Sequence, residues 1–178
     1  MTRTERTRRF AEADLYVVLT PAFCAGREPL AVLDAVLDAG VRLVQFREKD
    51  APDRTRLALG EAIRARTAEA GALLIMNDRV DLALLLGADG VHLGQEDLPL
   101  AQARALAPDL LLGQSTHDVS QAFAAQEQGA DYVNLGPIFA TQTKTASSAP
   151  LGPGIIAAAA PGLQIPFTVM GGIKEHNL

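Results

Sequence analysis

The chain has 178 residues, of which 48% are hydrophobic and 21% charged, a composition typical of globular domains. Sixteen Lys and Arg against 21 Asp and Glu give a formal net charge of -5. A chain of this charge has no general attraction for nucleic acid or an anionic membrane, so an anionic ligand requires a local basic cluster. The one cysteine, Cys24, excludes an internal disulfide and a cysteine-rich zinc site.

No apolar run approaches the ~18 residues that cross a bilayer. The opening MTRTERTRRF lacks the apolar centre of a signal peptide. We therefore expect a basic N-terminal tail over 1–14, a single domain over 15–178 and a cytoplasmic location.

Short apolar runs alternate along the chain with longer stretches of helical periodicity. The predicted strands are 15–20, 41–47, 73–77, 90–93, 110–113, 132–135 and 167–170. Asp118 and Gln121 have the spacing of a helix N-terminal cap. Gly-Ala-Asp occurs at 87–89 and again at 129–131, each time between a predicted helix and the next strand, which makes a faint internal repeat.

Successive β/α units with short connections predict parallel strands covered by helices. Seven units favour a (β/α)8 barrel over a doubly wound sheet, whose Gly-x-Gly-x-x-Gly turn is missing after the first predicted strand. A closed barrel needs an eighth strand. We therefore expect an α/β fold of the TIM-barrel type that lacks its last helix and strand, and the edge left beside the seventh strand suggests a homo-oligomer.

Functional side chains of such a barrel lie at the carboxyl ends of its strands. Gln45, Arg47 and Lys49 alternate along the second predicted strand and therefore share one side. Burying two unpaired cations on that side would cost free energy, and a bound anion would remove this cost. Arginine offers phosphate a planar fork, and lysine offers it a point charge. Alternatively, Arg47 and Lys49 leave the strand and pair with Glu48 or Asp50.

Carboxylates follow the third and fourth predicted strands. Asn77 and Asp78 end the third strand, and Asp97 follows the fourth. Carboxylates at neighbouring strand ends suit Mg2+, which prefers oxygen ligands and fills its remaining positions with water or substrate phosphate. Alternatively, each aspartate caps the helix that follows it.

A second phosphate is suggested by two later segments. Thr141, Thr143 and Lys144 follow the sixth predicted strand, and Gly171-Gly172 follows the seventh, where barrels bind phosphate through backbone N–H groups. A solvated loop and a tight turn are the alternatives. No nucleophile triad or Schiff-base lysine stands out, so these residues favour transfer with diphosphate as the leaving group over covalent catalysis.

Six segments resemble, in order, the thiamine-phosphate synthase family, also called thiamine-phosphate pyrophosphorylase. They are 44–49 (VQFREK), 77–83 (NDRVDLA), 90–97 (GVHLGQED), 115–117 (STH), 136–139 with 141–144 (GPIF and TQTK), and 171–173 (GGI). Each segment alone is weak evidence for the resemblance, whereas all six in the family's order are highly specific for it. The resemblance implies a TIM barrel that couples an aminopyrimidine diphosphate to a thiazole phosphate, with Mg2+, to give thiamine phosphate and diphosphate.

The resemblance also implies roles for individual residues. The pyrimidine diphosphate would be held by Gln45, Arg47, Lys49, Asn77 and Lys144. The metal would be ligated by Asp78 and Asp97, and the thiazole phosphate would be contacted by Thr141, Thr143 and Gly172. Ser115 would lie against the substrates. The residues expected to take part in catalysis are Arg47, Lys49, Ser115 and Lys144.

Two other functions stay open from the sequence. One is the related thiazole tautomerase, which would use His117 for proton transfer and would not need the diphosphate cluster. Against it stands the retention of Arg47, Lys49, Asp78, Asp97 and Lys144. The other is an incomplete barrel that binds phosphates without turnover, which the missing strand supports.

Overall fold

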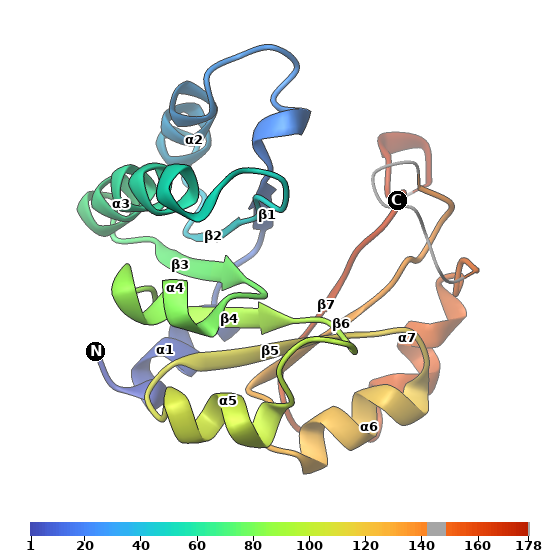
Figure 1. Ribbon diagram of the computed structural model, residues 1–178. Coiled ribbons are helices and arrows are strands. Elements are labelled where there is room, and N and C mark those ends of the chain that lie inside the picture. Colours follow the sequence, from blue (N-terminus) through green and yellow to red (C-terminus); the bar gives the residue numbers. More distant parts are fainter. Residues whose placement is uncertain (142–148, 178) are drawn as a thin grey trace. The chain divides into compact units, whose positions relative to one another are not determined.

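The computed structural model describes residues 1–141 and 149–177, in which strands and helices alternate (Figure 1). The strands are β1 (Tyr16–Leu19), β2 (Leu43–Phe46), β3 (Leu73–Asn77), β4 (Gly90–Leu93), β5 (Leu111–Thr116), β6 (Tyr132–Leu135) and β7 (Phe167–Val169). The α-helices are α1 (Arg3–Ala11), α2 (Pro29–Asp38), α3 (Asp53–Glu69), α4 (Val80–Leu85), α5 (Leu100–Leu106), α6 (Val119–Glu127) and α7 (Gly154–Ala159). Two 3-10 helices are η1 (Pro21–Phe23) and η2 (Glu175–Asn177).

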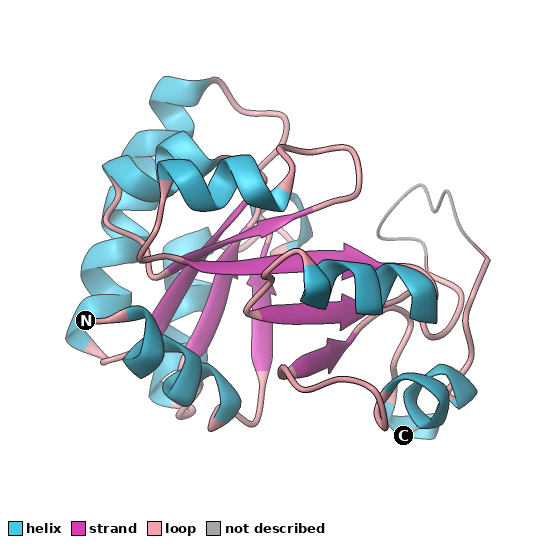
Figure 2. Cartoon of the chain, turned by 90° about the horizontal axis from the view of Figure 1, so that it is seen from below, coloured by secondary structure: helices cyan, strands magenta, loops and turns pink. Residues whose placement is uncertain are grey.

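The strands follow one another in chain order, from β1 to β7. Pairing is parallel between β1 and β2, β2 and β3, β3 and β4, β5 and β6, and β6 and β7. The chain divides into two compact units. The first comprises Met1–His92 and Ala103–Leu111, and the second comprises Leu93–Gln102 and Leu112–Leu178. Strands β1 to β3 and most of β4 belong to the first unit, and most of β5 with β6 and β7 belongs to the second. In each unit helices flank the strands (Figure 2).

In the first unit, every residue of β2 and β3 is buried. Unbroken burial of this kind is typical of parallel strands with both faces covered. Helix α3 contacts both of these strands, and α2 packs beside α3. Cys24, which follows η1, is only 3% exposed, and its Sγ lies 3.5 Å from the carbonyl oxygen of Thr20.

In the second unit, β5 continues past residue 113, where the apolar run ends. Ser115 and Thr116 pair in parallel with Asn134 and Leu135 of β6, and the Thr116 hydroxyl donates to the Asn134 carbonyl at 2.9 Å. Backbone pairing therefore extends the strand through polar residues that hydropathy excluded. Helix α6 contacts β6 and α7.

The N-terminal segment is a helix, α1, where the sequence predicts only a basic tail. Arg6 donates to the carboxylate of Asp89 and, at 2.9 Å, to the carbonyl of Asp109. Phe10 is 4% exposed and meets the Tyr16 ring edge-on, with the ring centroids 5.8 Å apart. Phe10 is the one buried residue of α1. The segment therefore lacks the repeated apolar positions from which a helix packed against the strands could be predicted.

The Gly-Ala-Asp repeat has a structural basis. The Asp89 carboxylate accepts the N–H of Leu74 at 3.0 Å, and the Asp131 carboxylate accepts the N–H of Leu112 at 2.8 Å. The backbone N–H groups of the two aspartates donate to the carbonyls of the same leucines, at 2.8 and 2.7 Å. Each aspartate therefore holds the beginning of the preceding strand through two hydrogen bonds and fixes the stagger of β3 against β4, and of β5 against β6.

The fold class is the predicted one, an α/β fold of the TIM-barrel type. The described residues supply seven consecutive parallel strands, and an eighth strand is not among them. The cap predicted for α6 is confirmed, because the Asp118 carboxylate accepts the N–H of Gln121 at 2.7 Å. Within the described part of the chain, no helix is both long and apolar enough to cross a membrane. A single domain over 15–178 stays a prediction.

Replacing Asp89 by alanine should lower the free energy of unfolding markedly. The carboxylate is 2% exposed and accepts from Arg6 at 3.3 Å and Arg64 at 2.8 Å. We expect a loss of about 3 kcal/mol in urea titrations, at the lower end of the range for breaking a buried ion pair, because Arg64 keeps partial access to water. As a control, Asp34→Ala removes an exposed partner of Arg66 and should change stability by about 0–1 kcal/mol. Equal losses in the two variants would contradict the assigned role of Asp89.

Candidate functional site

The exit of β2 carries Gln45 and Arg47. Gln45 is 3% exposed, and its Nε2 donates to the Tyr16 hydroxyl at 2.7 Å. The Arg47 N–H donates to the Leu19 carbonyl at 2.9 Å, so pairing with β1 continues one residue past the end of β2. Arg47 is half-buried. The backbone that carries its guanidinium is therefore held in place by the sheet.

Lys49 forms an ion pair with Asp78. The Lys49 Nζ lies 2.7 Å from Asp78 Oδ2, and the two side chains are 45% and 23% exposed. Arg47 and Lys49 both follow the last residue of β2, Phe46, as the first half of the alternative predicts. The partner of Lys49 is however the carboxylate at the next strand end. Glu48 instead accepts the N–H groups of Asp50 and Ala51, and so shapes its own loop.

Asp78 has an unusual backbone conformation. Its φ is 60°, in the left-handed region that few residues other than glycine adopt, although aspartate is among the tolerant ones. Its N–H donates to the His92 carbonyl at 2.8 Å. Helix α4 has Arg79 as its N-cap, without a side-chain cap. The N-cap position of α4 is therefore Arg79 and not Asp78, whose carboxylate pairs with Lys49. Asn77, which ends β3, is 8% exposed.

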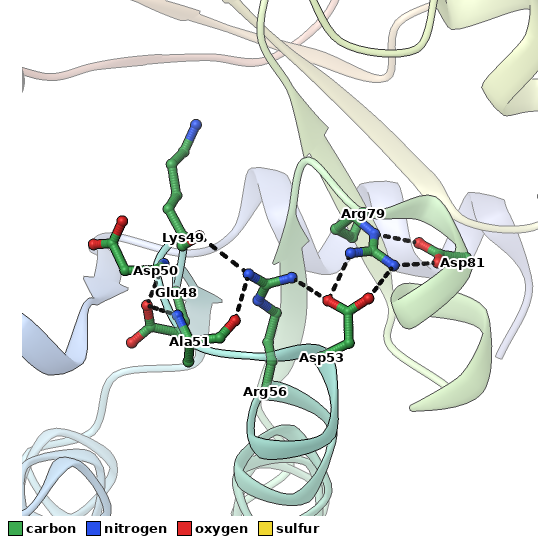
Figure 3. A network of polar contacts seen from close by, with 8 residues as sticks. All are labelled: Glu48, Lys49, Asp50, Ala51, Asp53, Arg56, Arg79 and Asp81. Carbon is green, nitrogen blue, oxygen red and sulfur yellow. Dashed lines mark hydrogen bonds and ion pairs between the residues drawn. The ribbon is translucent and has the colours of Figure 1, made fainter.

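A network of ion pairs lies beside Lys49 (Figure 3). Arg79 binds the carboxylates of Asp53 and Asp81, each through two hydrogen bonds. Arg56 donates to Asp53 and to the carbonyl oxygens of Lys49 and Ala51. Sequence reasoning missed this network, although Arg79 follows Asp78 directly and Asp53 and Arg56 have the i, i+3 spacing of a helical ion pair.

Arg79 changes the titration of both of its partners. Its hydrogen bonds lower the pKa of the Asp53 carboxyl below the ordinary value, and they do the same to the pKa of Asp81. The two carboxylates in turn raise the pKa of Arg79. All three groups are therefore charged throughout the neutral range.

In the second unit, Asp97 closes the turn after β4. Its Oδ2 accepts the N–H of Gly94 at 2.6 Å. In the same turn, Gln95 Nε2 donates to the Ser115 carbonyl at 2.6 Å and so ties the turn to β5. Ser115 itself is the penultimate residue of β5, next to Asn134 of β6. The first residues of this turn are thus held by the Asp97 carboxylate and by β5.

The loop after β6 packs tightly against the turn after β7. The N–H of Ile138 donates to the Met170 carbonyl, and the N–H of Phe139 donates to the Gly171 carbonyl, both at 2.9 Å. Gly172 has a φ of 66°, and a Cβ there would lie 2.5 Å from the carbonyl oxygen of Ala140. Only glycine fits this turn. Gly172 is therefore brought beside the residue that precedes Thr141. Two other predicted residues, Thr143 and Lys144, lie outside the described residues.

His117 is held by the backbone. Its ring Nδ1 lies 2.5 Å from the Gly136 carbonyl oxygen, next to the cis Gly136–Pro137 bond. Its backbone N–H donates to Gln121 Oε1 at 2.9 Å. These contacts fit a residue that joins the ends of β5 and β6. They add no support to His117 as a proton-transfer group.

The comparisons with known proteins agree on one family. The model of the family described as thiamine monophosphate synthase matches residues 15–178. A thiamine-phosphate synthase of Pelotomaculum thermopropionicum is 42% identical over 179 aligned positions, which cover 100% of this chain and 82% of that protein. That of Chloroflexus aurantiacus is 45% identical over 163, covering 92% of this chain and 76% of that protein.

A solved structure is similar as well. The thiamine phosphate pyrophosphorylase from Pyrococcus furiosus superposes with a TM-score of 0.83 and is 33% identical in sequence. The match covers 94% of this chain and 79% of that one.

Replacing Arg79 by methionine should raise the pKa of the Asp53 carboxyl toward its ordinary value of 3.8. With Arg79 present, the folded-state pKa lies below that of the unfolded chain. The ion pair therefore stabilises the fold above pH 3.8, and its contribution disappears as the pH falls through the lowered pKa. Carboxyl carbon NMR titration measures the shift. The pKa of Glu5, which Arg8 lowers, should not move, and an unchanged Asp53 pKa would refute the assignment.

Proposed function

The chain belongs to the thiamine monophosphate synthase family, and from this membership we propose that it joins an aminopyrimidinylmethyl diphosphate to a thiazole phosphate or its carboxylate. The enzyme is a transferase of thiamine biosynthesis, and its products are thiamine phosphate and diphosphate. Its substrates are small molecules. The cytoplasm as its compartment and a homo-oligomeric state stay predictions from the sequence.

The 2.7 Å ion pair between Lys49 and Asp78 carries the proposal. It brings a cation and a carboxylate side by side at the exits of two neighbouring strands, which supports a site for a diphosphate. We assign Gln45, Arg47, Lys49 and Asn77 to the pyrimidine diphosphate, because the buried Gln45 and Asn77 can orient the ring and the two cations can neutralise the phosphates.

We assign Asp78 and Asp97 as ligands of Mg2+. Among residues 1–141 and 149–177, no three His, Cys, Asp or Glu side chains are grouped as a metal cage. Magnesium does not need one, since it is commonly held by one or two carboxylates, with water and substrate phosphate completing the octahedron. The oxygen donors of Asp78 and Asp97 suit this ion. When bound, Mg2+ supplies positive charge that stabilises the departing diphosphate.

The reaction then needs positioning more than acid–base chemistry. The bond between the pyrimidine methylene and the diphosphate oxygen breaks, and the diphosphate leaves with the electron pair. The aminopyrimidine ring stabilises the resulting cation, and the thiazole nitrogen uses its lone pair to form the new carbon–nitrogen bond. Arg47 and Lys49 stabilise the charge that develops on the leaving group. No general base is required, in keeping with His117 being held by a carbonyl.

We place the thiazole phosphate at Gly172 and Thr141, with Thr143 as a further contact, Lys144 toward the diphosphate and Ser115 against both substrates. The support is the packing of the Gly171–Gly172 turn on the loop that ends in Ala140, which leaves no room for a side chain at Gly172. Holding the thiazole close to the pyrimidine methylene removes much of the entropic barrier to their reaction.

Incubation with both substrates and Mg2+ should yield thiamine phosphate, detected by chromatography. Asp97→Ala should abolish product, because it removes one of the two carboxylates proposed for the metal. Isomerisation of the thiazole without coupling would favour the tautomerase instead. Binding of diphosphate without any product would favour a barrel that lacks turnover.

Arg47→Ala should weaken binding of the pyrimidine diphosphate by about 1.5–3 kcal/mol, the range for hydrogen bonds to charged groups. Isothermal titration calorimetry with Mg2+ present measures the change. Arg27→Ala is a suitable control, because the Arg27 guanidinium donates to the Cys24 carbonyl rather than to any residue assigned here. Unchanged affinity in Arg47→Ala would remove Arg47 from the diphosphate site.

A further inference from the structure

We propose that Arg79 is a positioning residue for the pyrimidine diphosphate site. It locks the loop after β2 to the loop after β3, so that Lys49 and Asp78 are presented together. This inference rests on the proposed function, because it concerns how the assigned Lys49 and Asp78 are held. Arg79 is not assigned any contact with substrate.

The guanidinium of Arg79 binds two carboxylates at once. Its Nη1 and Nη2 donate to the two oxygens of Asp53 at 2.8 and 3.2 Å. Its Nε and Nη2 donate to the two oxygens of Asp81 at 2.8 and 2.6 Å. Two bidentate contacts fix the plane of the guanidinium, which a lysine ammonium would not do.

A first connection leads from Asp53 to the backbone of Lys49. The Asp53 Oδ1 that accepts from Arg79 also accepts from Arg56 Nη1 at 2.7 Å. The Nη2 of Arg56 in turn donates to the carbonyl oxygens of Lys49 and Ala51, at 3.2 and 3.0 Å. Figure 3 shows these contacts as a row along one side of the loop, with the Lys49 side chain extending away from Arg56.

A second connection runs from Arg79 through Asp78 to the side chain of Lys49. Arg79 is the peptide neighbour of Asp78, and Asp78 pairs with the Lys49 ammonium. The side chain of Lys49 is therefore held by the residue before Arg79, while its backbone is held through Asp53 and Arg56. Both paths start at one point, the N-terminus of α4.

Stability alone does not account for this network. The Arg79 and Asp53 side chains are 37% and 60% exposed, and exposed ion pairs contribute little to the free energy of unfolding. Among the described residues, Arg56 keeps a buried Nε without a hydrogen-bond partner, which is a destabilising feature. What the network does achieve is to connect two loops that follow different strands.

The test compares Arg79→Met with Arg66→Met. Arg66 on α3 forms an ion pair with Asp34 at 2.8 Å, with side-chain exposures of 36% and 51% that match those of the Arg79 pair, and it does not reach the loop of Lys49. We expect Arg79→Met to raise the KM for the pyrimidine diphosphate about tenfold, since small misplacements of binding groups are costly. The KM for the thiazole phosphate and the melting temperature should stay close to wild type. Arg66→Met should change neither KM.

Two further variants sharpen the test. Arg79→Lys keeps the charge but cannot bind two carboxylates bidentately, so it should behave like Arg79→Met. Asp53→Asn breaks the same path at its centre, and the double variant with Arg79→Met should be no worse than either single variant, because serial links are not additive. If Arg79→Met does not fold, Asp53→Asn carries the comparison.

Several outcomes would overturn the inference. They are full rescue by Arg79→Lys, equal effects on both KM values, or an equal effect of Arg66→Met. If the wild type forms no thiamine phosphate, the proposed function fails while the positioning role is still tested. In that case calorimetry with inorganic diphosphate and Mg2+ should show weaker binding in Arg79→Met than in Arg66→Met, and equal binding would overturn the positioning role.

Discussion

The stagger of β3 against β4, and that of β5 against β6, depends on the carboxylates of Asp89 and Asp131. Each holds both backbone groups of a leucine near the start of the preceding strand. In a parallel sheet the stagger of neighbouring strands determines where their carboxyl ends fall, and so where the next loops begin. The two buried aspartates lie at the amino ends of β4 and β6, and they control the geometry at the opposite ends without touching it.

At the exits of β2 and β3, the polar side chains are held in two different ways. Gln45 is buried and bound to a tyrosine hydroxyl, which leaves it little freedom. Lys49 and Asp78 are partly exposed and are held by each other and by loop contacts. A buried, fixed amide beside partly exposed charged side chains suits the proposed substrate, which has a flat heterocycle at one end and a flexible diphosphate at the other.

Much of this arrangement could be predicted from sequence, because it follows from local patterns. Apolar runs and glycine stops located the seven strands, and the polar residues Gln45, Arg47 and Lys49 were singled out by their alternation, although β2 ends at Phe46. Other features depend on contacts between distant segments, which no local pattern encodes. Arg79 reaches Asp53, 26 positions away along the chain, and Arg6 reaches Asp89, 83 positions away. The polar end of β5 was missed for the same reason, since its partners lie in β6. The individual roles of the site residues rest on family resemblance and stay predictions.

The burial of Cys24 has a practical consequence. It is the one thiol of the chain, it is 3% exposed, and buried thiols of this kind react slowly with alkylating reagents. A second cysteine introduced at an exposed position such as Asp50, in the loop that carries Lys49, would therefore take up a maleimide fluorophore selectively. Binding of diphosphate beside this loop would then be read from the emission, with the native thiol left in place.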